Sequence, residues 1–179
     1  MTLLSVSAAR SGLSLAPVEA SFGNRQAILP KGSERSDEAA LTAALILGLA
    51  RLPASAPVVV MVHGKGYCPD QPALNPHRLI FAPRAGHGRS RNVSWPRRLG
   101  FALPGPRDPL GLCIGFGWDA RGRLWQATES ADAVAGQLAA LVALIGWLDP
   151  GRRVDLIGHS LGARVILGAV PLLPAGALG

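Results

Sequence analysis

The sequence predicts an α/β fold with a mostly parallel sheet and helices on both faces. Continuous apolar runs, which are typical of strands buried on both faces, occur at residues 58–62 and 112–118. Between residues 130 and 148, apolar side chains recur at the spacing of a helix. Strand and helix patterns also alternate along the chain, which favours crossover connections and parallel pairing.

The first half of the chain contains one predicted helix and one buried strand. Residues 1–35 are mixed in composition, and residues 26–29 could form an edge strand. Ser36 precedes two acidic residues, so it predicts the N-cap of a helix that continues to about Arg51. Prolines in the following segment end this helix, and residues 58–62 are the first buried strand.

The second half begins with an interruption of this pattern. Residues 69–110 contain eight prolines and many arginines, and we interpret them as an insertion with a short candidate strand at residues 79–82. Four regular elements are predicted after it: a strand at 112–118, a helix at 130–148, a strand at 154–157, and a helix at 161–170 that Pro171 ends.

The composition is that of one globular domain. The chain has 179 residues, of which 49 % are hydrophobic, so it is long enough to bury a core. Cys68 and Cys113 fit neither a disulfide framework nor a zinc-ligand spacing. We therefore expect free thiols, no metal, no cofactor and a cytoplasmic location. The longest strongly apolar run, residues 39–50, is too short to span a bilayer, so no transmembrane segment is expected.

The basic residues are unevenly distributed. The net charge is +7, and five arginines gather beside Trp95: Arg84, Arg89, Arg91, Arg97 and Arg98. Such a cluster could attract acidic substrates, lipid headgroups or nucleic acid. A solvated surface loop is the simpler interpretation, and no nucleic-acid partner is expected.

Two glycine-containing loops follow predicted strands. His63-Gly64-Lys65-Gly66 comes after residues 58–62, and Gly158-His159-Ser160-Leu161-Gly162 comes after residues 154–157. In a parallel sheet, the carboxyl ends of the strands lie at one edge. A strand that turns directly into a helix lifts the Ser160 hydroxyl out of the sheet, while Gly158 and Gly162 keep the turn free of side chains.

These loops provide groups that acyl transfer requires. Ser160 would attack a carbonyl carbon, and the backbone N–H groups of Lys65 and Leu161 would bind the oxyanion. Gly64 would let the first loop turn sharply, and the Lys65 side chain is dispensable for this role.

With these motifs, residues 57–173 resemble the α/β-hydrolase superfamily, in particular its serine esterases and lipases. The resemblance implies that residues 36–179 form part of an α/β-hydrolase fold, with a small acyl or ester substrate. It also implies a structural role for His159. His63 precedes the first loop and is expected to be structural, through a hydrogen bond to the loop backbone.

In that family the loop after the intervening strand often reads D-x-R-G, which matches residues 119–122. Residues 82–90 (APRAGHGRS) are a rival match, because they resemble the family's glycine-rich G-H-G-x-S turn. We prefer the first placement, since the strand at residues 112–118 leads directly into the crossover helix.

The resemblance stops at the nucleophile helix. In this superfamily an acid and then a histidine follow the serine, but the 19 residues after Ser160 contain no Asp, Glu or His. The chain therefore resembles a hydrolase truncated after that helix, and its catalytic acid and histidine cannot be identified. Asp155 is expected to be structural, and His77 or His87 would have to fold back over the site.

Three functions follow from these observations. The favoured one is a serine esterase or lipase, incomplete as given, that forms an acyl-enzyme at Ser160. The second is an inactive α/β-hydrolase-like protein that binds a small acyl ligand. The third is an arginine-rich interaction protein for anionic partners. The sequence leaves the oligomeric state open, and an unpaired last strand would be an aggregation hazard.

Overall fold

The computed structural model describes residues 2–9, 12–15, 34–83, 93–101 and 111–178. Within this part of the chain, five strands form one sheet in the order β2-β1-β4-β3-β5. Every neighbouring pair is parallel except β1 and β2. The prediction of an α/β fold with a mostly parallel sheet is thus confirmed. The strands are β1 (Thr2–Ala9), β2 (Gly12–Leu15), β3 (Val58–Val62), β4 (Leu112–Trp118) and β5 (Val154–Gly158).

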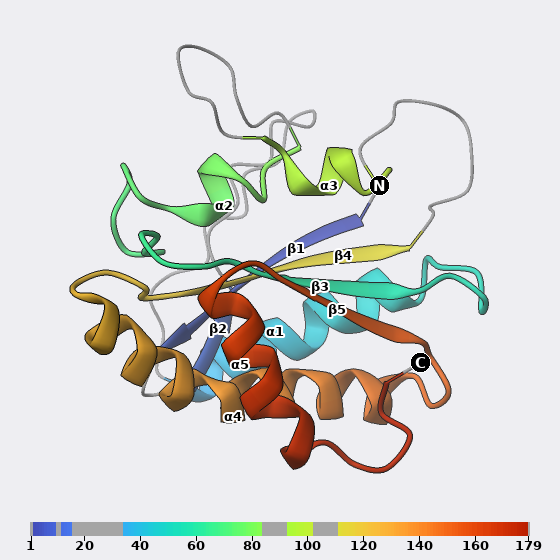
Figure 1. Cartoon of the computed structure of the whole chain (residues 1–179). Coiled ribbons are helices and arrows are strands. Elements are labelled where there is room, and N and C mark those ends of the chain that lie inside the picture. The colour runs from blue at the N-terminus through green and yellow to red at the C-terminus, as the bar shows by residue number, and fades with distance from the viewer. Residues whose placement is uncertain (1, 10–11, 16–33, 84–92, 102–110, 179) are drawn as a thin grey trace.

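Helices lie on both faces of the sheet, but unequally (Figure 1). Three long helices cover one face, and two four-residue helices from the predicted insertion lie over the other. The long helices are α1 (Glu34–Leu49), α4 (Leu124–Leu148) and α5 (Leu161–Ala169), which the 3-10 helix η1 (Val170–Leu172) continues. The short ones are α2 (Pro76–Leu79) and α3 (Trp95–Arg98).

Burial on both faces explains the apolar run of β3. Val58, Val60 and Val62 belong to the core cluster formed with α1, α4 and α5. Their neighbours Val59 and Met61 belong to a second cluster, beneath the insertion. Successive side chains of a strand point to opposite faces, so an uninterrupted apolar sequence satisfies both clusters.

The N-terminal segment contains structure that the sequence did not predict. β1 lies inside the sheet between β2 and β4, and β2 is an edge strand. The predicted edge strand at residues 26–29 lies outside the described residues. β1 alternates Leu4, Val6 and Ala8 with serines, and Val6 and Ala8 are buried in the main cluster. This alternation was a signal for a strand.

Three other element boundaries differ from the predictions. The N-cap prediction for Ser36 is wrong, because α1 begins at Glu34 and Ser36 lies within its first turn. The candidate strand at residues 79–82 is wrong, because Asn75 caps α2 through its side-chain oxygen and Pro76 starts the helix. α4 begins at Leu124 rather than near Ser130. The Arg123 N–H donates to Oε1 of Gln126 (2.8 Å), which satisfies one backbone donor before the first turn.

Of the described helices, α4 alone is long and apolar enough to cross a membrane by its length and composition. Its inward face is buried in the core cluster, where it packs with strands and with α5. The residues of this face include Val134, Leu138, Leu141, Val142 and Ile145. In this structure α4 serves as a core helix of the fold.

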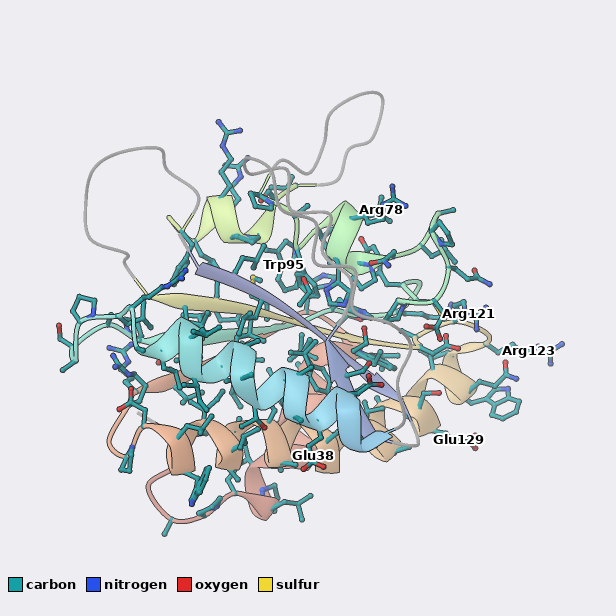
Figure 2. The ribbon with its side chains drawn as sticks, turned by 180° about the vertical axis from the view of Figure 1, so that it is seen from behind. Glu38, Arg78, Trp95, Arg121, Arg123 and Glu129 are labelled. Atoms are coloured by element: carbon teal, nitrogen blue, oxygen red, sulfur yellow. The ribbon has the colours of Figure 1, made fainter. Side chains whose placement is uncertain are left out.

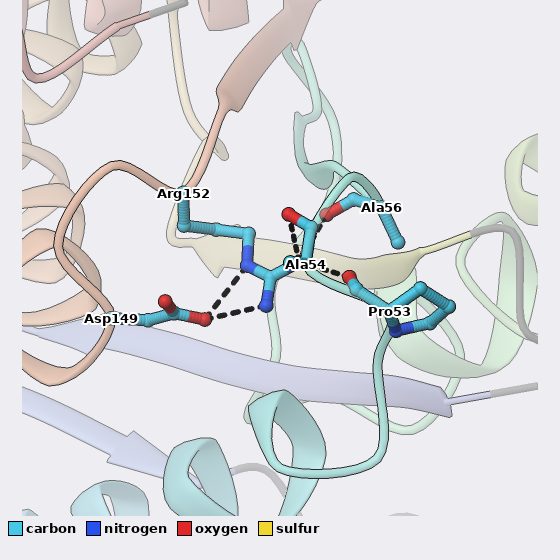
Figure 3. A network of polar contacts seen from close by, with 5 residues as sticks. All are labelled: Pro53, Ala54, Ala56, Asp149 and Arg152. Atoms are coloured by element: carbon cyan, nitrogen blue, oxygen red, sulfur yellow. Dashed lines mark hydrogen bonds and ion pairs between the residues drawn. The ribbon is translucent and has the colours of Figure 1, made fainter.

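Arg152 attaches the start of β5 to the connection between α1 and β3 (Figure 3). Its side chain is only 5 % exposed, and its guanidinium binds the Asp149 carboxylate at 2.6 Å. The same group donates to the carbonyls of Pro53, Ala54 and Ala56. One buried cation therefore satisfies three loop carbonyls and fixes where β5 enters the sheet.

Candidate active site

The two glycine-containing loops meet at one edge of the sheet. β3 lies between β4 and β5, and Val62 pairs with both Phe116 and Gly158. The carboxyl ends of the three strands are therefore level, and the loops after them start side by side. This is the edge at which parallel sheets carry their chemistry.

Ser160 sits on this edge in an unusual backbone conformation. It is exposed, it is the N-cap residue of α5, and its φ and ψ are 55° and −121°. Among the described residues it is the only non-glycine with a positive φ. Such a conformation costs on the order of 1–3 kcal/mol in a residue with a Cβ, so the surrounding fold must impose it.

Glycines make the turn possible. A Cβ on Gly162 would collide with the Val62 carbonyl oxygen and lie 2.7 Å from the His63 carbonyl oxygen. On Gly158 it would lie 2.7 Å from the Ala163 nitrogen. On Gly64 it would lie 2.9 Å from the Ser160 Cβ, so the first loop packs directly against the serine.

Two backbone donors face no acceptor in the described part of the chain. The N–H of Gly66 donates to the Ala120 carbonyl and that of Gly162 to the His159 carbonyl. No such bond is found there for the N–H of Lys65 or of Leu161. Leu161 also begins α5, whose N-terminus carries the positive end of the helix dipole.

His63 joins the two loops that follow β3 and β4. Its Nε2 accepts from the Trp118 backbone N–H (3.0 Å), so its Nδ1 carries the proton and donates to the Gly64 carbonyl (2.8 Å). The Trp118 indole stacks on the ring and donates to the His63 carbonyl. Burial lowers the pKa of His63 to about 4, so the ring is neutral at pH 7. The geometry makes His63 a brace of the loop, with no nitrogen free to take a proton from Ser160.

His159 is exposed next to Ser160, and the insertion reaches it. The Trp95 ring meets the imidazole edge-on, with 6.4 Å between ring centroids, and it also contacts Phe81. Trp95 is a residue of the site that was not predicted from the sequence. The signal was Ser94, whose hydroxyl accepts from the Arg97 N–H as an N-cap and donates to the Ala82 carbonyl.

The remaining candidates for a base or an acid lie elsewhere. His77 is buried on the other side of the sheet from the long helices, with its Nε2 3.3 Å from the Ser7 hydroxyl.

Asp155 pairs with Arg153. Asp119 binds Arg121 through both carboxylate oxygens, and this bond lowers the pKa of Asp119. His87 lies outside the described residues. Within the described part of the chain, no hydrogen bond to the Ser160 hydroxyl is found.

Neither cysteine contributes to this site. Cys68 and Cys113 are both free and buried. Burial raises the pKa of both thiols, that of Cys113 to about 12, so neither is a thiolate at neutral pH. The described residues also contain no cluster of three or more histidine, cysteine or acidic side chains able to hold a metal ion.

In comparisons with known proteins, no family model, no curated protein and no solved structure matches the chain.

Proposed function

We propose that the chain carries the nucleophile half of an α/β-hydrolase-like active site and acts as a serine hydrolase on carboxylic esters. The backbone of Ser160 is the observation that carries this proposal. A strained serine between a parallel strand and a helix N-terminus is costly to maintain. Its benefit is an exposed hydroxyl near backbone donors that have no acceptor among the described residues.

The chemistry assigned to the site is acyl transfer. The Ser160 hydroxyl oxygen attacks the carbonyl carbon, and the developing oxyanion binds the N–H groups of Lys65 and Leu161. The loss of one such donor typically costs on the order of 10²–10³ in rate. The alcohol leaves, and water then hydrolyses the acyl-Ser160 ester. The Ser160 proton needs a base, and under this proposal the base comes from outside the described residues.

A second function is favoured by one observation: no described residue forms a hydrogen bond with the Ser160 hydroxyl. Without a base, the same loops would form an inert site that binds a small acyl ligand. Its backbone N–H groups could still donate hydrogen bonds to the ligand's carbonyl oxygen. The two functions differ in whether Ser160 becomes covalently modified.

Covalent labelling with a fluorophosphonate distinguishes them. Trypsin should release Val154–Arg164, which contains Ser160 and no other serine. The hydrolase proposal predicts the adduct on this peptide and its loss in Ser160→Ala. A matched control, Ser130→Ala on α4, should label like the wild type. Absence of labelling in the wild type would overturn the hydrolase proposal and leave the inert binding site.

A further inference from the structure

Two large apolar side chains are exposed side by side at the edge of the sheet that carries Ser160. Leu124 is 63 % exposed and Trp125 56 %, both in the first turn of α4. Basic side chains flank them in the sequence and across the neighbouring loop. We call this surface the rim, and define it as Lys65, Arg121, Arg123, Leu124 and Trp125.

The rim is continuous with the candidate active site. The Gly66 N–H donates to the Ala120 carbonyl, and the Ala120 N–H donates to the Tyr67 carbonyl, both at 2.9 Å. These bonds hold the loop with Lys65 against the loop that leads into α4. Gly64, beside Lys65, packs on Ser160. Figure 2 shows Arg121 and Arg123 on one side of the molecule, close to the start of α4.

The charge of the rim is positive. Arg121 pairs with Asp119 at 2.6 Å and also lies within electrostatic reach of the Asp70 carboxylate, so its charge is compensated. For Lys65 and Arg123, no ion pair is found among the described residues. Both side chains are exposed, and the whole chain has a net charge of +7. The rim therefore presents apolar groups together with uncompensated cations.

The opposite end of α4 provides a comparison within the same helix. Trp147 is 75 % exposed there, more than Trp125. The nearby cations are neutralised, because Arg152 binds Asp149 and Arg153 binds Asp155. Exposed tryptophan is thus present at both ends of α4, but the described residues combine it with uncompensated cations only at the Ser160 edge.

We propose that the rim docks on the surface of an anionic lipid bilayer. Tryptophan and leucine favour the boundary between headgroups and acyl chains, and lysine and arginine bind the phosphates of anionic lipids. Docking in this orientation turns the Ser160 edge toward the membrane. The binding itself needs no hydrolysis, so it stands independently of the proposed function.

Sedimentation with lipid vesicles tests the proposal. The full chain is mixed with vesicles of phosphatidylcholine alone, or of phosphatidylcholine with phosphatidylglycerol. The mixed vesicles should bind roughly tenfold more tightly, since each uncompensated cation adds a severalfold preference for anionic lipid. Added salt should remove this preference. The double substitution Leu124→Ser/Trp125→Ala should weaken binding to both kinds of vesicle by roughly tenfold or more.

Matched variants distinguish binding through the rim from non-specific adsorption to the vesicles. Trp147→Ala removes a more exposed tryptophan from the same helix and should leave binding unchanged, as should Ser160→Ala. Arg123→Gln should reduce only the preference for anionic vesicles. The proposal is overturned if neither kind of vesicle binds, if the Leu124/Trp125 variant binds like the wild type, or if Trp147→Ala weakens binding equally. Equal binding to both kinds of vesicle would also contradict the proposal that the partner membrane is anionic.

Discussion

Two buried histidines, His63 and His77, remain neutral inside the fold and make its stability depend on pH. Burial lowers the pKa of His63 to about 4. Burial, together with the nearby His63, lowers the pKa of His77 to about 3. Both values lie below the 6.5 of an unfolded histidine, so the unfolded chain binds more protons between pH 6.5 and these values.

Stability should therefore fall as the pH falls. A group whose folded pKa is lowered contributes stability above its unfolded pKa, and this contribution disappears on acidification toward the folded pKa. Between pH 7 and pH 5, each histidine should reduce the free energy of unfolding by roughly 2 kcal/mol. Urea denaturation at a series of pH values measures this dependence.

The substitution His77→Gln provides the control, because glutamine does not titrate. It should remove about half of the decrease between pH 7 and pH 5, whatever its effect at pH 7. An unchanged pH dependence in this variant, or a wild-type protein equally stable at pH 5 and pH 7, would show that His77 is not buried as a neutral ring.

At the level of elements, the position of β5 depends on a residue outside the strand. Arg152 lies in the turn before β5 and binds the carbonyls of Pro53, Ala54 and Ala56 together with Asp149. β5 pairs with β3 alone in the sheet, so this attachment supplements a single line of strand hydrogen bonds. Ser160 follows β5 directly, and its placement depends on the same attachment.

Arg152→Ala should destabilise the fold markedly. The substitution leaves three loop carbonyls and the Asp149 carboxylate without their donor, which typically costs on the order of 3 kcal/mol. Thermal or urea denaturation measures the loss. Arg164→Ala breaks an exposed ion pair with Asp132 and serves as the control, with a much smaller effect expected. Similar losses in the two variants would contradict the role given to Arg152.

For the whole molecule, the sequence predicted the elements whose patterns are set by burial. The apolar runs of β3 and β4 satisfy two core clusters, so few other structures would suit them. The start and end of α5 followed from Ser160, the glycines around it and Pro171. These features depend on residues that are close in the sequence, so local sequence patterns predict them.

Contacts between distant segments could not be predicted in this way. β1 lies in the sheet because its register with β4 buries Val6 and Ala8, a pairing across more than a hundred residues. Trp95 reaches His159 because Ser94 bonds the Ala82 carbonyl and because Trp95 donates to the Ile80 carbonyl. No pattern in the residues near Ser160 predicts this contact. The sequence thus predicted the two loops of the site but not the contact that Trp95 of the insertion makes with His159.

The fold as a whole holds Ser160 in a strained conformation that presents its hydroxyl. The free energy of unfolding of Ser160→Gly, compared with that of Ser160→Ala, tests it most directly. Glycine adopts a φ of 55° without strain, whereas alanine keeps the strain of a Cβ. We expect Ser160→Gly to be more stable than Ser160→Ala by about 1 kcal/mol or more. A glycine variant no more stable than the alanine variant would contradict the account.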